Sequence, residues 1–151
     1  MTTQERIYLT ARDNIGETVW ARNKKRIARR NSKVQFGDGE YKCNLFVYEV
    51  LLAAGIDIGL TKKSHPKLFF LGNDRPACAS DWYDEKVCEA IDTRLTKIDN
   101  GDVATDGKHM GIVYYNNDEK KWGTINAGES RVNFTPFGSW GPKGMKFFRL
   151  W

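Results

Sequence analysis

Cys43 stands where a nucleophile could be activated. The residues from Lys42 to Ala54 are apolar on most sides and Gly55 follows them, a pattern that predicts a buried helix with Cys43 in its first turn. Free backbone N–H groups and the helix dipole favour a thiolate at such a position. A free cysteine is also often only a small buried side chain, so catalysis requires a second group.

The second group is a base within hydrogen-bonding reach of the thiol, and the chain contains two histidines, His65 and His109. His65 precedes Pro66 in a lysine-rich stretch, which is typical of a solvated surface loop. His109 opens a run of β-branched and aromatic residues that predicts a strand. We therefore expect His109 to be the base, held rigidly at a strand end.

A third polar residue should orient the imidazole, and hairpin geometry nominates Asn126. A turn over 116–119 would pair Tyr115 with Lys120, and counting back along the two strands then brings Asn126 opposite His109. Directly opposite residues of an antiparallel pair have Cβ atoms about 4.5–5.5 Å apart, within reach of the amide oxygen. The result is a Cys-His-Asn set.

Other roles for Asn126 stay open. Asparagine is favoured in turns, and this one could simply begin the turn that contains Gly128. A single β-bulge would shift the register and replace it with Ile125 or Ala127. Glu129 or Asp102 would then be the fallback orienting residues.

The N-terminal third carries the strongest charge feature. Six of the nine residues from Arg22 to Arg30 are basic. Asn14 followed by Glu17 resembles a helix start, which predicts a basic amphipathic helix running to Arg30. Such a run is often only a solvated helix face, but it would also attract anionic partners.

The rest of the pattern predicts an α+β fold. A helix is expected over 82–91 inside an irregular insertion over 62–100, where Gly and Pro interrupt the pattern. Short strands are expected over 110–115, 121–125, 131–134 and 145–150. Helices first and strands second indicate the Cys43 helix packed on one face of an antiparallel sheet. We expect one domain spanning 1–151.

Composition bounds the function classes. The chain has 151 residues and a formal net charge of +5, which favours nucleic acid, acidic lipid or carboxylate-rich cell wall as partners. No stretch approaches the roughly 20 apolar residues of a membrane span, and Met1 to Ile15 lacks a secretory apolar block. The sequence therefore suggests a mature form or a route that needs no signal.

Three cysteines, Cys43, Cys78 and Cys88, leave an odd thiol after any pairing. Cys78 and Cys88 could close a short loop in an oxidising compartment, although geometry rather than spacing decides whether two cysteines can bridge. Four ligands at finger-like spacing are absent from the sequence, so neither a structural zinc site nor a cofactor is expected.

The order of these motifs resembles the NlpC-type and CHAP-type papain-like peptidoglycan amidases. The segment 41–47 reads Tyr-Lys-Cys-Asn-Leu-Phe-Val, 101–103 reads Gly-Asp-Val, and 109–113 reads His-Met-Gly-Ile-Val. Those families place a helix-start cysteine, a Gly-Asp and a His-x-Gly-Ile strand in this order, and Asn126 falls where their third polar residue stands. Two features depart from the pattern: Asn44 replaces the Ser-Gly usual in NlpC-type enzymes, and 62–100 has no counterpart.

Within this group the chain looks most similar to the type VI secretion amidase effectors, of the second effector family, and to their domesticated animal relatives. The resemblance implies a cysteine hydrolase that cleaves the stem peptide of bacterial peptidoglycan or its diaminopimelate–D-alanine crosslink. It further implies an antibacterial toxin, secreted or delivered into the periplasm of a target bacterium. An immunity protein would be a partner, and the enzyme would act as a monomer.

Four aromatic residues could line a substrate groove near such a site: Tyr41, Trp82, Tyr83 and Trp140. Aromatic side chains also dominate protein cores, so packing is the alternative role for each. Two other functions compete with the amidase. The same catalytic set could deamidate a protein or transfer an acyl group. A basic nucleic-acid-binding domain would explain the charge but would leave the catalytic residues unexplained, so we do not expect it.

Overall fold

The computed structural model describes residues 1–60, 75–91, 97–139 and 144–151. The α-helices are α1 (Thr3–Asp13), α2 (Cys43–Ala53) and the short α3 (Ala79–Tyr83). The strands are β1 (Arg26–Ile27), β2 (Gln35–Phe36), β3 (Val103–Thr105), β4 (Met110–Asn116), β5 (Lys121–Ala127), β6 (Val132–Pro136) and β7 (Lys146–Phe148). A 3₁₀ turn, Phe137–Ser139, lies between β6 and β7.

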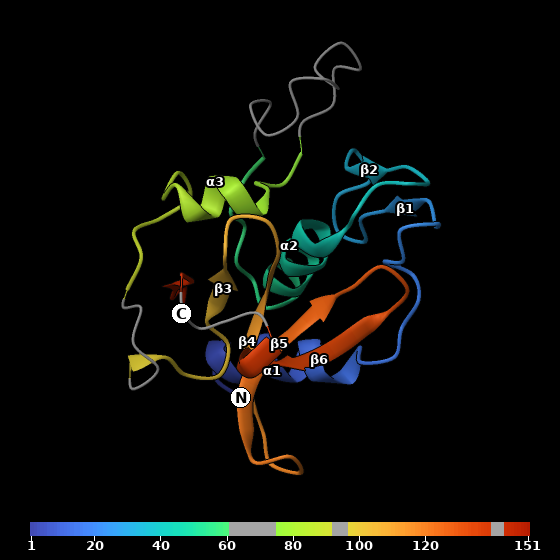
Figure 1. Cartoon of the computed structure of the whole chain (residues 1–151). Coiled ribbons are helices and arrows are strands. Elements are labelled where there is room, and N and C mark those ends of the chain that lie inside the picture. Colours follow the sequence, from blue (N-terminus) through green and yellow to red (C-terminus); the bar gives the residue numbers. More distant parts are fainter. Residues whose placement is uncertain (61–74, 92–96, 140–143) are drawn as a thin grey trace.

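The C-terminal third forms the predicted antiparallel sheet. Five strands pair in the order β6-β5-β4-β3-β7, and β1 and β2 form a separate two-stranded ribbon. The four strands expected from the sequence are present with small shifts of their ends. Strand β3, which the patterning did not single out, joins β4 to β7. The α+β class is therefore confirmed (Figure 1).

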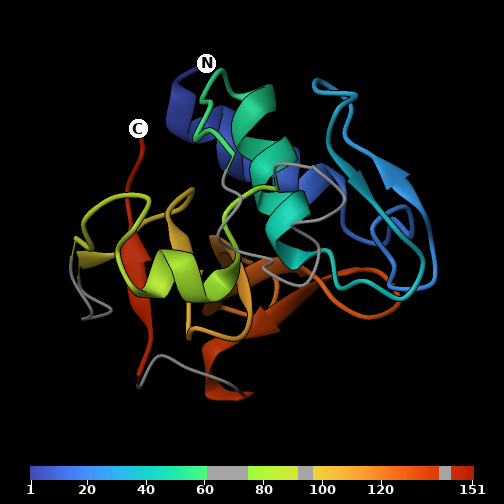
Figure 2. The ribbon, with the colours of Figure 1, turned by 90° about the horizontal axis from the view of Figure 1, so that it is seen from above.

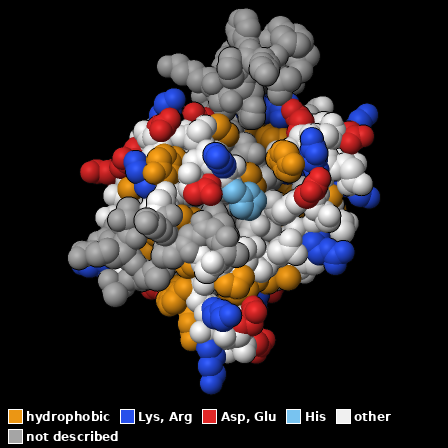
Figure 3. Space-filling view, in the orientation of Figure 1, with side chains coloured by type: hydrophobic (Ala, Val, Ile, Leu, Met, Phe, Trp, Pro, Cys, Tyr) orange, Lys and Arg blue, Asp and Glu red, His pale blue; other side chains and the backbone are white. Residues whose placement is uncertain are grey.

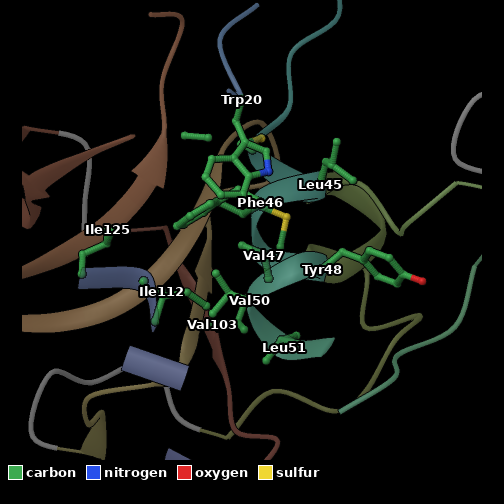
Figure 4. Close-up of a cluster of buried hydrophobic side chains, with 14 of the residues drawn as sticks. Trp20, Leu45, Phe46, Val47, Tyr48, Val50, Leu51, Val103, Ile112 and Ile125 are labelled. Carbon is green, nitrogen blue, oxygen red and sulfur yellow. The ribbon is translucent and has the colours of Figure 1, made fainter. Parts of the chain in front are cut away.

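Helix α2 confirms the helix predicted around Cys43. It is apolar nearly all round because it is buried nearly all round, and Gly55 ends it with a left-handed φ of +87°. It packs against β4 and β5 and against α1. Figure 4 shows Val50 of α2 beside Val103 and Ile112 of the sheet, with Tyr48 and Leu45 pointing to the other side of the helix.

The helix expected from Asn14 to Arg30 is absent. Helix α1 begins earlier, because Thr2 and Glu5 form a reciprocal capping box, and Asn14 is its C-cap rather than the start of the next helix. The chain beyond Gly16 continues as turns and the short strand β1. The Asn14–Glu17 spacing therefore marks a helix end.

The basic run forms turns and the short strand β1, and a buried carboxylate binds part of it. Glu49 of α2 accepts hydrogen bonds from Arg26 at 2.8 and 3.0 Å, from the Arg29 backbone N–H at 2.8 Å and from Trp20 Nε1. A buried ion needs such compensation. Part of the run is therefore internal structure rather than a solvated helix face, while Lys24 and Lys25 remain exposed.

The insertion also differs from expectation. The predicted helix over 82–91 is wrong: α3 ends at Tyr83, and Glu85 adopts a positive φ of 58° that no helix continues. The parts of the insertion at 61–74 and 92–96 lie outside the described residues.

The sheet carries a hydrophobic cluster on each face. Helices α1 and α2 lie side by side on one face (Figure 2), where their apolar side chains join Met110 and Ile112 in one cluster. On the other face Val113 and Ala104 pack with Phe137 and Phe147. Among the described helices, none is long and apolar enough to cross a membrane.

Candidate active site

Cys43 is the first residue of α2, and its side chain is buried with 9% of the residue exposed. Burial raises the pKa of its thiol to about 11, although the backbone N–H groups of Met110, Asn44 and Cys43 itself act in the opposite direction. The helix-end amides favour the thiolate, as expected, but desolvation outweighs them. A base must remove the proton.

The backbone contact with Met110 brings the chain segment next to His109 close to the thiol. Met110 opens β4 and directly follows His109 in the chain. Its N–H acts on the Cys43 thiol, so the start of α2 meets the start of β4. Figure 3 shows that a histidine reaches the molecular surface, with charged side chains of both signs around it; His109 is the histidine within the described residues.

Asn126 holds the His109 ring. Its Oδ1 lies 2.9 Å from His109 Nε2. Its Nδ2 faces the Thr124 carbonyl at 3.3 Å and the hydroxyls of Thr124 and Thr135 at 3.0 and 3.1 Å. A carbonyl can only accept, so the amide nitrogen must point to Thr124 and the amide oxygen to the ring.

This arrangement fixes the tautomer of the histidine. Because Asn126 Oδ1 is an acceptor, Nε2 of the neutral His109 ring carries the hydrogen. Nδ1 then carries the lone pair and is the nitrogen that can accept a proton. A buried amide that is itself held by two threonines favours one orientation of the ring.

The contact arises in a register different from the predicted one. Tyr115 pairs with Trp122, not with Lys120, so the ladder is shifted by two residues. A shift of two keeps every side chain on the same sheet face, and Asn126 reaches His109 as a diagonal neighbour.

Gly111 makes room for this diagonal contact. A Cβ at this position would lie 2.8 Å from the Ile125 carbonyl oxygen and 2.9 Å from the Cβ atoms of Asn126 and Thr124. A side chain there would push the asparagine away from the ring. The glycine of the His-x-Gly segment therefore has a physical reason in this fold.

Side-chain hydrogen bonds fix the turn before His109. Asp106 accepts hydrogen bonds from the backbone N–H groups of Lys108 and His109, both at 2.8 Å. Thr105 joins this turn to α3, because its hydroxyl donates to the Ala79 carbonyl at 3.1 Å and accepts from the Gly107 N–H. The imidazole is thus fixed through its backbone as well as through its ring.

Lys42 fixes the other half of the site. Its Nζ is buried and donates to four backbone carbonyls, those of Ala21, Arg22, Gly37 and Glu40, at 2.8–3.3 Å. These carbonyls belong to two loops on either side of the ribbon formed by β1 and β2. The lysine next to Cys43 therefore ties both loops to the start of α2.

The four aromatic residues expected in a groove have four different outcomes. Tyr41 is 60% exposed and lies two residues before the nucleophile. Trp82 is wrong as a groove residue, because it is fully buried against Phe148 in the core. Tyr83 is half-buried and packs over Gly107 of the turn before the histidine. Trp140 lies outside the described residues.

The residues considered as alternatives to Asn126 have other partners. Asp102 is fully buried and paired with Arg149 at 2.9 Å, and Glu129 lies near Arg22. His65 lies outside the described residues.

The suggested bridge between Cys78 and Cys88 is not formed in the structure, where Cys43, Cys78 and Cys88 all have free thiols. The Cys78 thiol instead lies 3.0 Å from the Ser80 hydroxyl and 3.3 Å from an Asp81 carboxylate oxygen, which places it at the start of α3.

Sequence reasoning missed Lys42, Thr124 and Thr135 as supporting residues. Alternation along β5 could have found Thr124, because it shares a sheet face with Asn126. Nothing in the local sequence marks Lys42 as buried, since lysine is ordinarily exposed.

Comparison with known proteins gives no matching family model, no matching curated protein and no matching solved structure.

Proposed function

We propose that this chain is a papain-like cysteine hydrolase that cleaves an amide bond, with Cys43 as nucleophile, His109 as base and Asn126 as the residue that orients the base. The observation that carries this proposal is the 2.9 Å contact between His109 Nε2 and Asn126 Oδ1. It leaves Nδ1 as the proton acceptor and the thiol as the proton donor. The residue after His109, Met110, directs its backbone N–H at the thiol of Cys43, the first residue of α2.

The reaction follows from these roles. His109 takes the thiol proton as Cys43 Sγ attacks the amide carbonyl carbon and forms a C–S bond. First-turn N–H groups of α2 lack intrahelical partners, and the Lys42 side chain does not cap them, so they can stabilise the oxyanion. The C–N bond then breaks as His109 gives its proton to the leaving amine.

The resulting thioester is hydrolysed in a second step. A water molecule, deprotonated by His109, attacks the thioester carbonyl, and the Cys43 thiolate leaves and recovers a proton from the imidazolium. The products are a new carboxylate and a new amine. Acyl transfer would consume the same thioester without releasing a carboxylate, so product analysis separates the two reactions.

The substrate we propose is bacterial peptidoglycan, at its stem peptide or its diaminopimelate–D-alanine crosslink, and the biological role is that of an antibacterial toxin delivered to the periplasm or secreted. The support is the resemblance of the segments around Cys43 and His109 to peptidoglycan amidases, together with the net charge of +5, since the wall is anionic. Exposed Lys24 and Lys25 are suited to hold the enzyme near this polymer.

The test is digestion of Gram-negative sacculi by wild type, Cys43→Ala and, as a matched control, Cys88→Ala, with muropeptides identified by mass spectrometry. Wild type and Cys88→Ala should convert crosslinked muropeptides to monomers or trim their stem peptides, and Cys43→Ala should leave them unchanged. Cleavage that persists in Cys43→Ala would refute the mechanism, and an unchanged profile with the wild type would refute the substrate.

A further inference from the structure

A charged pocket of about 560 Å³ is lined in part by Arg22, which contacts Tyr41 and Lys42, the two residues before Cys43. Its lining comes from three separate segments of the chain. The lining residues are Thr18, Ala21, Arg22, Asn23, Lys24, Asp38, Gly39, Glu129 and Ser130.

Arg22 connects this pocket to the residues just before Cys43. The Arg22 guanidinium lies 4.6 Å from the centre of the Tyr41 ring, and Tyr41 precedes Cys43 by two residues. Arg22 Nε donates to the Gly39 carbonyl at 3.1 Å, and the Arg22 carbonyl accepts from Lys42 Nζ at 3.3 Å. The guanidinium is therefore aligned on an aromatic face next to the site.

A second lining segment, 129–130, comes just after strand β5, which contains Asn126. Glu129 follows Asn126 by three residues, and its carbonyl accepts the Arg22 backbone N–H at 2.8 Å. The Glu129 carboxylate lies 3.7 Å from the Arg22 guanidinium. These side chains are 68% and 44% exposed, respectively, so a ligand can reach both charges.

The charges in the pocket select among ligand types. Arg22 and Lys24 contribute positive charge, and Asp38 and Glu129 contribute negative charge. A simple carboxylate at Arg22 would also meet the nearby Glu129 carboxylate, and a simple ammonium at Glu129 would meet Arg22. A group with an ammonium and a carboxylate on one carbon satisfies both at once, because each of its charges faces its opposite.

We propose that this pocket binds a zwitterionic amino-acid group of the substrate, with its carboxylate on Arg22 and its ammonium on Glu129. The inference rests on the proposed function, since it treats the pocket as a substrate subsite beside Cys43. It adds a chemical requirement, namely that the amide substrate carries a free α-amino-acid end.

The experiment measures binding without turnover. The probe is a disaccharide tripeptide muropeptide from Gram-negative sacculi, whose diaminopimelate residue carries an ammonium and a carboxylate on one carbon. Isothermal titration calorimetry with the Cys43→Ala protein compares this probe with a form in which the diaminopimelate amine is acetylated. Acetylation removes the ammonium and should weaken binding about tenfold or more, as expected for loss of a charge-assisted hydrogen bond.

Variants made in the Cys43→Ala background assign the effect to the pocket. Arg22→Gln and Glu129→Gln should each bind the native probe about tenfold more weakly and lose the discrimination against the acetylated form. Arg12→Gln is the matched control, because Arg12 and its partner Asp13 are 48% and 68% exposed, close to the values for Arg22 and Glu129. It should bind as the Cys43→Ala protein does.

Equal binding of both probes, no measurable binding, or pocket variants that behave like Arg12→Gln would overturn the inference. A wild-type protein that cleaves sacculi while the pocket variants bind normally would refute the subsite alone. Discriminating binding without any cleavage by the wild type would instead refute the proposed hydrolase and leave the subsite standing.

Discussion

Substituting Gly111 by alanine should damage both stability and activity, because β5 crosses close to this position. The added Cβ would lie 2.8 Å from the Ile125 carbonyl oxygen and 2.9 Å from the Cβ of Asn126, where carbon atoms normally stay about 3.5–4.0 Å apart. The strands must therefore separate by roughly 0.5–1 Å. Overpacking of this kind costs about 1–3 kcal/mol of unfolding free energy.

The same displacement moves the Asn126 amide relative to His109 Nε2, now 2.9 Å from it. A misplacement of about 1 Å in a catalytic group can cost on the order of 100-fold in rate. We therefore expect Gly111→Ala to lower kcat/KM on muropeptides by about 10- to 100-fold. The melting temperature should fall by about 2–4 °C for each kcal/mol of unfolding free energy lost.

Gly138→Ala is the matched control for this prediction. Nothing lies within 4 Å of a Cβ built at Gly138, so the same chemical change adds no clash. Its melting temperature and kcat/KM should equal those of the wild type. A Gly111→Ala protein with wild-type stability and wild-type kcat/KM would refute the role assigned to this glycine.

Three further predictions concern Thr135, Cys43 and Lys42. Thr135→Val removes one partner of the Asn126 amide and should lower kcat/KM by about 3- to 10-fold, whereas Thr135→Ser should restore it; equal activity of the Val and Ser variants would contradict this positioning role. Burial raises the Cys43 pKa to about 11, so the folded state holds the thiol proton more tightly than the unfolded state does. The stability that this contributes is complete below about pH 8.5 and is lost as the pH rises through 11. The unfolding free energy of the wild type, measured with urea, should therefore fall by on the order of 2–3 kcal/mol relative to that of Cys43→Ala over this pH interval. Equal pH dependence of the unfolding free energy in the two proteins would contradict this prediction. Lys42→Met leaves buried carbonyls unpaired and should cost at least about 2 kcal/mol of unfolding free energy, while exposed Lys24→Met should leave the urea midpoint unchanged.

Local patterns predicted the elements that have strong local signals. The apolar run ending at Gly55 defined α2, and alternating β-branched and aromatic residues defined β4 and β5. The helix predicted for the basic stretch after Asn14 is absent because contacts with residues outside that stretch determine its conformation. Glu49, far along the chain, binds Arg26 and the Arg29 backbone, and such tertiary contacts override local propensity.

The candidate site was predictable to the extent that sheet geometry determines it. The register assumed for the β4–β5 hairpin was wrong, yet a shift of two residues left Asn126 on the face that reaches His109. The protonation state of Cys43 was not predictable, because it depends on how deeply α2 is buried. The hydrogen bond from the Asn126 amide to the Thr135 hydroxyl depends on β6, which no pattern near the asparagine reveals.

The most direct test of the central claim is to detect the acyl-enzyme. Wild type, Cys43→Ala and Cys88→Ala are mixed with muropeptides, quenched in acid after milliseconds and analysed by intact-protein mass spectrometry followed by peptide mapping. The mechanism predicts a mass increase equal to the acyl part of the stem peptide, located on Cys43 in wild type and Cys88→Ala and absent from Cys43→Ala. Turnover by Cys43→Ala, or an adduct mapped to Cys78 or Cys88 instead, would contradict it.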